Sequence, residues 1–380
     1  MTELLYYKDA YIKDFCATVV DAKRVGDNYE IFLDKTAFFS ELGGQTSDTG
    51  VIGGVRVLRV DEVGGRIVHT TDGCLVVGST VECRVDFTER FEKMQLHTAE
   101  HLVCGIIHRE FGYDNVGFHL GDAEVTLDVN GVMTREMIDR VELIANRAIY
   151  ENVEVRAFFP TADEAAALEY RSKLDITENL RIVSIAGYDD CACCAPHVKR
   201  TGEIGLIKIL DFMKHRGGTR IRLLAGHRAM RDYIKRCEAA QEISSMLCVP
   251  QADIAAGVKD FMAAAFQNEG KIKAANQRIV ELEDSLVSPT DKNVVVFAKN
   301  ITIADARELV NRMMKKVLGI SVVLLGIDGS YSYVMGSENV DVPTACREAN
   351  AALNGKGGGR PPMVQGSFGT TAEAIKKYFS

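Results

Sequence analysis

In the segment Asp86–Gly112, DFTERFEKMQLHTAEHLVCGIIHREFG, the hydrophobic pattern of the chain changes from that of strands to that of a helix. Asp86 and Glu89 form a plausible capping pair at the start of the predicted helix, and Gly112 ends it. Before this helix, residues 1–87 form short alternating strands separated by glycine turns, as in a small barrel or sandwich. After it, short strands and helices follow one another, which indicates an α+β region.

This order of strands and helices predicts an α+β multidomain protein. The predicted domains are a β-barrel at residues 1–87, an α+β core at 88–226, a helical linker or hairpin at 227–288 and a small α/β domain at 289–380. The linker is polar and rich in Ala, with apolar residues at helical spacing and an interruption near Val249-Pro250. The last domain includes a glycine-rich segment, NGKGGGRPP, which we expect to be a loop.

The composition is that of an ordinary globular protein, with 47% hydrophobic and 26% charged residues among 380. No apolar run approaches the roughly 18 residues that a membrane span needs, and the N-terminus lacks the order of a signal peptide, so we expect a cytoplasmic protein without membrane contact. The net charge of −8 argues against non-specific binding of nucleic acid by the whole surface. The segment Lys199–Arg236 differs, because it holds eleven Lys or Arg and three acids. It is therefore a candidate phosphate-facing surface.

Two groups of residues have the chemistry of metal ligands. His97 and His101 are four residues apart, so both imidazoles share one face of the predicted helix. About 100 residues later, a cluster of cysteines precedes His197: Cys191, Cys193 and Cys194. Together the groups offer enough ligands for one tetrahedral zinc, although spacing alone leaves open which cysteine binds. Each group alone is also compatible with ordinary buried polar residues or thiols.

Two further patterns allow competing interpretations. The sequence His97–His101 also has the form H-x-x-E-H, an inverted zinc-protease signature in which Glu100 would be the general base. We favour this interpretation less, because the histidines pair here with a Cys–His element rather than with a distant acid. In the segment Ala37–Gly50, the adjacent Gly43 and Gly44 let the backbone approach a ligand closely, or simply form a tight turn of the barrel.

These motifs resemble those of the AlaX alanyl-tRNA editing proteins, which are similar to the editing domain of alanyl-tRNA synthetase. The family pattern G-G-Q-x-x-D-x-G is matched at residues 43–50, H-x-x-x-H at 97–101, and C-x-x-x-H followed by V-x-x-T-G-x-I-G at 193–205. The resemblance continues through residues 218–226 and 354–369; the latter segment is similar to the DHH-associated C-terminal domain of the synthetase. It covers nearly the whole chain, as in long-form AlaX proteins.

The resemblance implies a zinc-dependent hydrolase that acts in trans on mischarged alanine tRNA, removing serine, glycine or both. It implies that zinc is held by His97, His101, Cys193 and His197. Editing of the threonyl type and a non-catalytic, zinc-stabilised tRNA-binding module are the alternatives. The chain departs from the family where Cys194-Ala195-Pro196 replaces the usual Gly-Gly-Thr, and where Glu100 replaces a frequent Thr. These departures leave the choice between serine and glycine open, as well as whether zinc activates water or only positions the substrate.

The remaining site predictions concern substrate and partners. Glu100 is the candidate for contacting the substrate amine or the attacking water, and the candidates for recognising a serine hydroxyl are Gln45, Thr98 and Ser47. The residues predicted to contact substrate or tRNA are Gly43, Gly44, Arg216, Arg220, Arg222, Lys356 and Arg360. The last two would bind the tRNA elbow, as the resemblance implies. The apolar stripe of Asp260–Leu286 predicts a homodimer through the C-terminal region.

Overall fold

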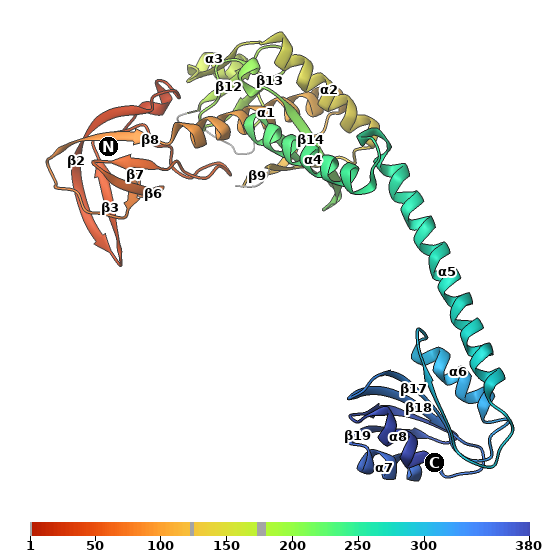
Figure 1. Ribbon diagram of the computed structural model, residues 1–380. Helices are drawn as coiled ribbons and strands as arrows, with labels where there is room; N and C mark the ends of the chain where they lie inside the picture. The colour runs from red at the N-terminus through yellow and green to blue at the C-terminus, as the bar shows by residue number, and fades with distance from the viewer. Residues whose placement is uncertain (1, 122–124, 173–179) are drawn as a thin grey trace. The chain divides into compact units, whose positions relative to one another are not determined.

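The computed structural model describes residues 2–121, 125–172 and 180–380, and the chain clusters into two compact units, residues 1–239 and 240–380 (Figure 1). Each unit combines helices with its own sheets, which confirms the predicted α+β multidomain class. The finer division into four domains stays a prediction. No helix in the described part of the chain has an apolar stretch long enough to cross a lipid bilayer.

The first unit begins with six antiparallel strands that close into a barrel in the order β2-β3-β7-β6-β5-β8. The strands are β2 (Asp14–Val25), β3 (Asn28–Leu33), β5 (Gly50–Ile52), β6 (Val55–Val63), β7 (Arg66–Thr71) and β8 (Thr80–Val85). Alternate side chains point inward and form the barrel core, among them Val19, Ile31 and Val60. Two short strands, β1 (Glu3–Leu4) and β4 (Lys35–Thr36), form a separate parallel pair. A 3₁₀ turn, η1 (Leu5–Tyr7), follows β1 in the chain.

Helix α1 (Phe87–Phe111) follows the barrel directly and has the ends that the sequence predicts. The side chain of Asp86 accepts a hydrogen bond from the backbone N–H of Glu89, and Gly112 ends the helix in the left-handed conformation at φ 69°. Most of α1 is buried, because it packs in one core with α2 (Arg135–Glu151) and with the sheet beside it. The helix is therefore a rigid support for the side chains that it carries.

Two sheets surround α1. One has the order β14-β15-β10-β9, formed by β9 (Asn115–Leu120), β10 (Val125–Val129), β14 (Ile207–His215) and β15 (Gly218–Ala225). The other is antiparallel, formed by β11 (Val155–Phe158), β12 (Ile182–Ile185) and β13 (Asp189–Ala192). The smaller elements of this unit are α3 (Ala162–Ala167) and η2 (Thr201–Ile204).

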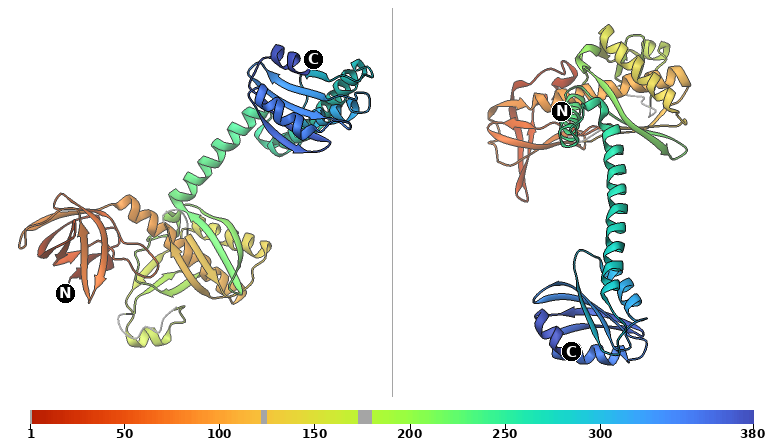
Figure 2. Two further views of the ribbon diagram at one scale, coloured as in Figure 1. Left: turned by 90° about the horizontal axis from the view of Figure 1, so that it is seen from below. Right: turned by 45° about the vertical axis from the view of Figure 1, so that its right-hand side comes forward.

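Helix α4 (Gly226–Leu247) ends before Val249-Pro250, where the sequence predicts an interruption, and a 3₁₀ turn, η3 (Gln251–Asp253), leads into α5 (Ile254–Leu286). Figure 2 shows α5 as one continuous helix.

The C-terminal sheet has the order β16-β17-β18-β20-β19. Its strands are β16 (Val294–Ala298), β17 (Ser321–Ile327), β18 (Ser330–Gly336), β19 (Gly355–Arg360) and β20 (Met363–Phe368). Neighbouring residues of β17 face opposite sides, so Val322 packs with α7 (Val342–Ala352) and α8 (Ala372–Phe379), whereas Val323 packs with α6 (Ile303–Met313).

The sequence predicts a loop at NGKGGGRPP. This prediction is wrong, because residues 355–360 form the edge strand β19. Gly357 is required by its neighbours, because a Cβ there would lie 2.5 Å from the backbone oxygen of Gln365 and 2.6 Å from the hydroxyl of Tyr333.

Candidate metal centre

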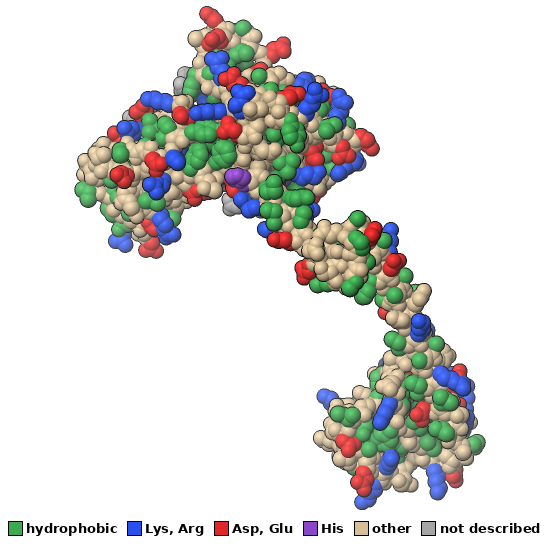
Figure 3. Space-filling view, turned by 45° about the horizontal axis from the view of Figure 1, so that its top comes forward, with side chains coloured by type: hydrophobic (Ala, Val, Ile, Leu, Met, Phe, Trp, Pro, Cys, Tyr) green, Lys and Arg blue, Asp and Glu red, His purple; other side chains and the backbone are tan. Residues whose placement is uncertain are grey.

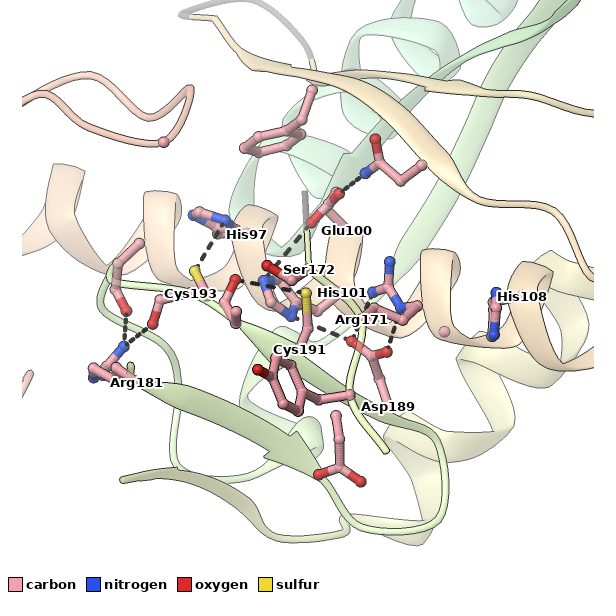
Figure 4. Close-up of a pocket in the computed structure, with 18 of the residues that line it drawn as sticks. His97, Glu100, His101, His108, Arg171, Ser172, Arg181, Asp189, Cys191 and Cys193 are labelled. Atoms are coloured by element: carbon pink, nitrogen blue, oxygen red, sulfur yellow. Dashed lines mark hydrogen bonds and ion pairs between the residues drawn. The ribbon is translucent and has the colours of Figure 1, made fainter. Parts of the chain in front are cut away.

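The structure brings the four predicted ligands together in the first unit. His97 and His101 lie one turn apart on α1, and Cys193 and His197 lie in the segment after β13. One ligand atom from each residue lies within 4.8 Å of the others. Cys193 Sγ is 3.4 Å from His197 Nε2. It is 3.7 Å from His97 Nε2, a contact drawn in Figure 4. Cys193 is the cysteine of this four-residue group, whereas Cys191 lies in a second group with His101 and Asp189.

The electrostatic surroundings suit a metal ion. Burial opposes a thiolate at Cys193, but the neighbouring imidazoles hold the pKa of this thiol well below its usual value. Burial lowers the pKa of His197 to about 3, so this ring is neutral near pH 7. Burial also opposes a charge on His101, but nearby cysteines and Asp189 raise the pKa of His101 well above its usual value. A thiolate surrounded by imidazoles is a donor set that zinc prefers.

Each imidazole has a partner on the side away from the cluster. Nδ1 of His97 lies 2.7 Å from Gln45 Oε1 and Nδ1 of His197 lies 3.0 Å from Thr98 Oγ1, both at hydrogen-bond geometry. Nδ1 of His101 lies 3.3 Å from Asp189 Oδ2, which is an ion-pair contact without hydrogen-bond geometry. The Thr98 hydroxyl donates to the carbonyl of Met94, so it accepts the proton on His197 Nδ1. Metal-bound histidines almost always donate their second ring N–H in this way.

This geometry bears on the three residues proposed to recognise a serine hydroxyl. Gln45 and Thr98 are fully buried behind the imidazoles, and neither lines the adjoining cavity. The Ser47 hydroxyl accepts a hydrogen bond from the backbone N–H of Val60. In this arrangement, Gln45 and Thr98 orient metal ligands and Ser47 holds the barrel. The amide nitrogen of Gln45 is buried, with no hydrogen-bond partner among the described residues.

Three residues of the centre were not predicted from the sequence. Arg171 donates two hydrogen bonds to the carboxylate of Asp189, at 2.7 and 2.8 Å, and so fixes the partner of His101. Arg181 donates to the backbone carbonyls of Cys193 and Ala195, at 2.8 and 2.9 Å, and so holds the ligand segment. The only signal in the sequence is the position of Asp189 shortly before the cysteine cluster, which by itself does not single out an acid.

A cavity of about 1110 Å³ lies beside the four ligands and follows α1. Glu100 lines it, although only 4% of the residue is exposed. The carboxylate of Glu100 accepts hydrogen bonds from the side chains of Asn115 and Cys104, and its Oε2 lies 3.9 Å from His101 Nε2. Glu100 is thus held at the boundary between the ligand cluster and the cavity, and its role there stays a prediction.

Gly43 and Gly44 have different surroundings. Gly43 lines the cavity. Gly44 has a φ of +85°, and a Cβ there would lie 2.9 Å from the backbone oxygen of Phe118, so the loop approaches β9 closely at this glycine. The backbone N–H of Leu120 donates to the carbonyl of Gly44 at 3.0 Å, which joins the loop of the barrel to the edge of the core.

Some of the basic residues predicted to contact tRNA form ion pairs within the protein, whereas others are exposed. Arg220 donates to both oxygens of Asp128 at 2.7 Å, and Arg222 donates to Asp211 at 3.0 Å. Arg216 is exposed in the turn between β14 and β15. In the C-terminal unit, the exposed Lys356 and Arg360 both lie on β19. Internal ion pairs therefore compensate part of the positive charge of the segment Lys199–Arg236.

Comparisons with known proteins match both units. The model of the threonyl and alanyl tRNA synthetase second additional domain matches residues 180–222, and that of the DHHA1 domain matches residues 291–378. The alanyl-tRNA editing protein AlaX-L of Pyrococcus horikoshii is 28% identical over 399 residues, which cover 99% of this chain and 96% of that protein.

Alanine–tRNA ligases match over a similar length of this chain. The ligase of Ignicoccus hospitalis is 30% identical over 94% of this chain, and the ligase of Korarchaeum cryptofilum is 30% identical over 96%. The chain spans only 40% and 43% of these two ligases. Similarity along nearly the whole chain, together with the matches to both domain models, confirms that this protein resembles the long-form AlaX alanyl-tRNA editing proteins.

Proposed function

We propose that this protein hydrolyses the ester bond between a wrong amino acid, serine or glycine, and the terminal ribose of alanine tRNA. The observation that carries the proposal is the cluster of three histidines and one cysteine at the side of a cavity, with an outer partner for each imidazole. The similarity to an alanyl-tRNA editing protein supports the substrate class. Such a reaction belongs in the cytoplasm, where tRNA is charged.

The residues fit zinc as the cofactor. His97, His101, Cys193 and His197 would hold it, because they offer soft and intermediate ligands within the reach of one ion. A zinc ion bound there supplies positive charge that polarises a carbonyl or favours the ionisation of water.

The chain's own residues supply the proton transfer. Glu100 is placed to accept a proton from the attacking water, because its carboxylate faces the cavity and is held by Asn115. The oxygen of this water forms a bond with the carbonyl carbon while the ester C–O bond breaks. The proton then passes to the ribose oxygen that leaves. The products are the free amino acid and a tRNA with a free terminal hydroxyl.

The test is a deacylation assay with the full chain and four substrates: seryl-, glycyl- and alanyl-tRNA of the alanine type, and seryl-tRNA of the threonine type. We expect the first two to be hydrolysed and alanyl-tRNA to be spared. Glu100→Gln should lower the rate by about 100-fold or more, while the zinc content is retained. Preference for the threonine type would indicate threonyl-type editing. Binding without turnover would indicate a tRNA-binding module.

A metal analysis tests the ligand set separately. We expect about one zinc per chain, lost in Cys193→Ser and in the double variant His97→Ala, His101→Ala. Cys191→Ser and Cys194→Ser are matched controls on the same segment and should keep the metal. If either control loses zinc while Cys193→Ser keeps it, the choice of cysteine is wrong.

A further inference from the structure

The cavity is larger than the proposed reaction needs for the amino acid alone. Its lining follows α1 from His97 to Arg109, a separation of twelve residues that corresponds to about 18 Å of helix. A seryl or glycyl group fills only a small part of the 1110 Å³. If the substrate is an aminoacyl ester of tRNA, as proposed above, the remaining space is available to the nucleotide that carries the ester.

One end of the cavity has an aromatic wall. Tyr7 lines the cavity, its ring meets the ring of Phe159 edge-on at a centroid distance of 5.4 Å, and the guanidinium of Arg181 lies 5.3 Å from its centroid. Tyr6 packs against Tyr7 from the protein interior, at 4.6 Å between ring centroids. Phe159 is 50% exposed beside this wall. Aromatic rings next to an arginine form the kind of surface on which single-stranded nucleic acids stack their bases.

The opposite end of the cavity has a different character. Figure 4 shows His108 at the far end of the row of side chains from Arg181. At this end the lining includes Arg109 and Asp114, whose carboxylate lies 2.8 Å from His108 Nδ1. We call it the His108 end.

The His108 end also has an aromatic residue beside an arginine. Tyr188 lies 5.3 Å from the guanidinium of Arg109, but its hydroxyl donates to the carboxylate of Glu151 at 2.6 Å. The same type of pair is thus present at both ends of the cavity, and its surroundings distinguish the two. This makes Tyr188 a matched control for Tyr7.

We propose that the ring of Tyr7, supported edge-on by Phe159, forms the subsite for the base of the 3′-terminal nucleotide, so that the ester reaches the ligand cluster from the Arg181 end. The amino acid then lies along α1, between the ligand cluster and the His108 end. The proposal rests on the proposed function for the identity of the ligand.

The experiment uses an uncharged RNA hairpin with an acceptor stem and 2-aminopurine as its 3′-terminal base. Stacking of this base on an aromatic ring quenches its fluorescence. We expect binding of the hairpin to the full chain to quench the signal, and Tyr7→Ala to abolish the quenching and weaken binding by about five- to 150-fold. Tyr7→Phe should restore both, because it keeps the ring. Phe159→Ala should weaken binding in the same direction, and its exposed position makes a folding defect an inadequate explanation.

Tyr188→Ala is the control and should leave quenching unchanged. Loss of quenching in Tyr188→Ala with retention in Tyr7→Ala would place the base at the His108 end and overturn the proposal. Absence of quenching in the wild-type chain would overturn it as well. Since the probe carries no ester, these readouts are independent of hydrolysis. A chain that quenches the probe but spares seryl-tRNA would contradict the proposed reaction while supporting the subsite.

Discussion

The orientation of His97 depends on a single side chain that comes from the barrel loop. Gln45 Oε1 accepts the proton on His97 Nδ1, which leaves Nε2 free to face the other ligands. We predict that Gln45→Met, which has a similar length but no acceptor, weakens zinc binding by about 10- to 100-fold. Competition with a chromogenic chelator measures this affinity. Gln45→Glu retains an acceptor and should retain the metal; equal losses in both variants would contradict the role assigned to the acceptor.

A second buried residue makes the stability of the barrel depend on pH. Burial lowers the pKa of His69 to about 4, from an ordinary value of 6.5. Between these values the unfolded chain binds a proton that the folded barrel does not, so the free energy of unfolding falls as the pH falls from 6.5 toward 4. The full contribution is present above pH 6.5. We predict a loss on the order of 2 to 3 kcal/mol between pH 7 and pH 4.5.

Urea unfolding at a series of pH values measures this dependence. In the wild-type protein, Nε2 of His69 lies beside the hydroxyl of Thr36, and Nδ1 lies beside the backbone carbonyl of Ile31. His69→Gln keeps a polar side chain but removes the titration. The difference between the two proteins should therefore narrow as the pH falls from 7 to 4.5. A difference that does not change with pH would contradict the prediction.

At the residue scale, the sequence indicates the four side chains that the structure brings together, but not the residues that contact them from outside. His97 and His101 could be paired because helical spacing is a local property, and Cys193 with His197 because both lie in one short segment. Arg171 and Asp189 contact each other across 18 positions, and Gln45 reaches His97 across 52. Contacts of this kind depend on the packing of separate elements, which hydrophobic periodicity does not describe.

Among the elements, α1 has the ends expected from its sequence because its capping residues are local. Its buried Arg90 was not predictable in the same way. The guanidinium pairs with Asp48 and also donates to the backbone carbonyls of Ala10 and Ala37, so it joins α1 to the barrel loop. The assignment of β19 as a loop failed because glycine usually signals a turn; here Gly357 makes room for Tyr333 under an edge strand.

The β14–β15 hairpin yields a prediction about tRNA binding. Arg220 is committed to Asp128, whereas Lys214 and Arg216 are exposed near the turn. We predict that Lys214→Ala with Arg216→Ala weakens tRNA binding and lowers the slope of log affinity against log salt by about one unit per lost phosphate contact. Arg220→Ala should have a smaller effect on the slope. Binding titrations between about 50 and 200 mM salt measure it. An unchanged slope in the double variant would place the tRNA elsewhere.

At the scale of the whole molecule, the surface of α5 bears on whether two chains associate. Its apolar residues follow the alternating four- and three-residue spacing of a coiled coil, interrupted once where Asn268 occupies the position between Ala265 and Ile272: Ile254, Val258, Phe261, Ala265, Ile272, Ala275, Ile279, Leu282 and Leu286. Only Asn276 and Val280 are buried along the helix. Phe261 and Ile272 are 66% and 61% exposed, and Figure 3 shows hydrophobic side chains at the surface of this helix. A regular apolar stripe in water favours association.

We therefore predict that the full chain is a homodimer at micromolar concentration, with two copies of α5 paired along this stripe. Phe261→Glu with Ile272→Glu should give a monomer, because pairing would then bury four unpaired carboxylates. Ala263→Glu with Gln277→Glu adds the same charge to exposed positions on the other side of the helix and should leave the dimer intact. Light scattering gives the mass of each protein. A wild-type monomer would exclude the dimer, and a dimer that survives the first pair of substitutions would place its interface outside this stripe.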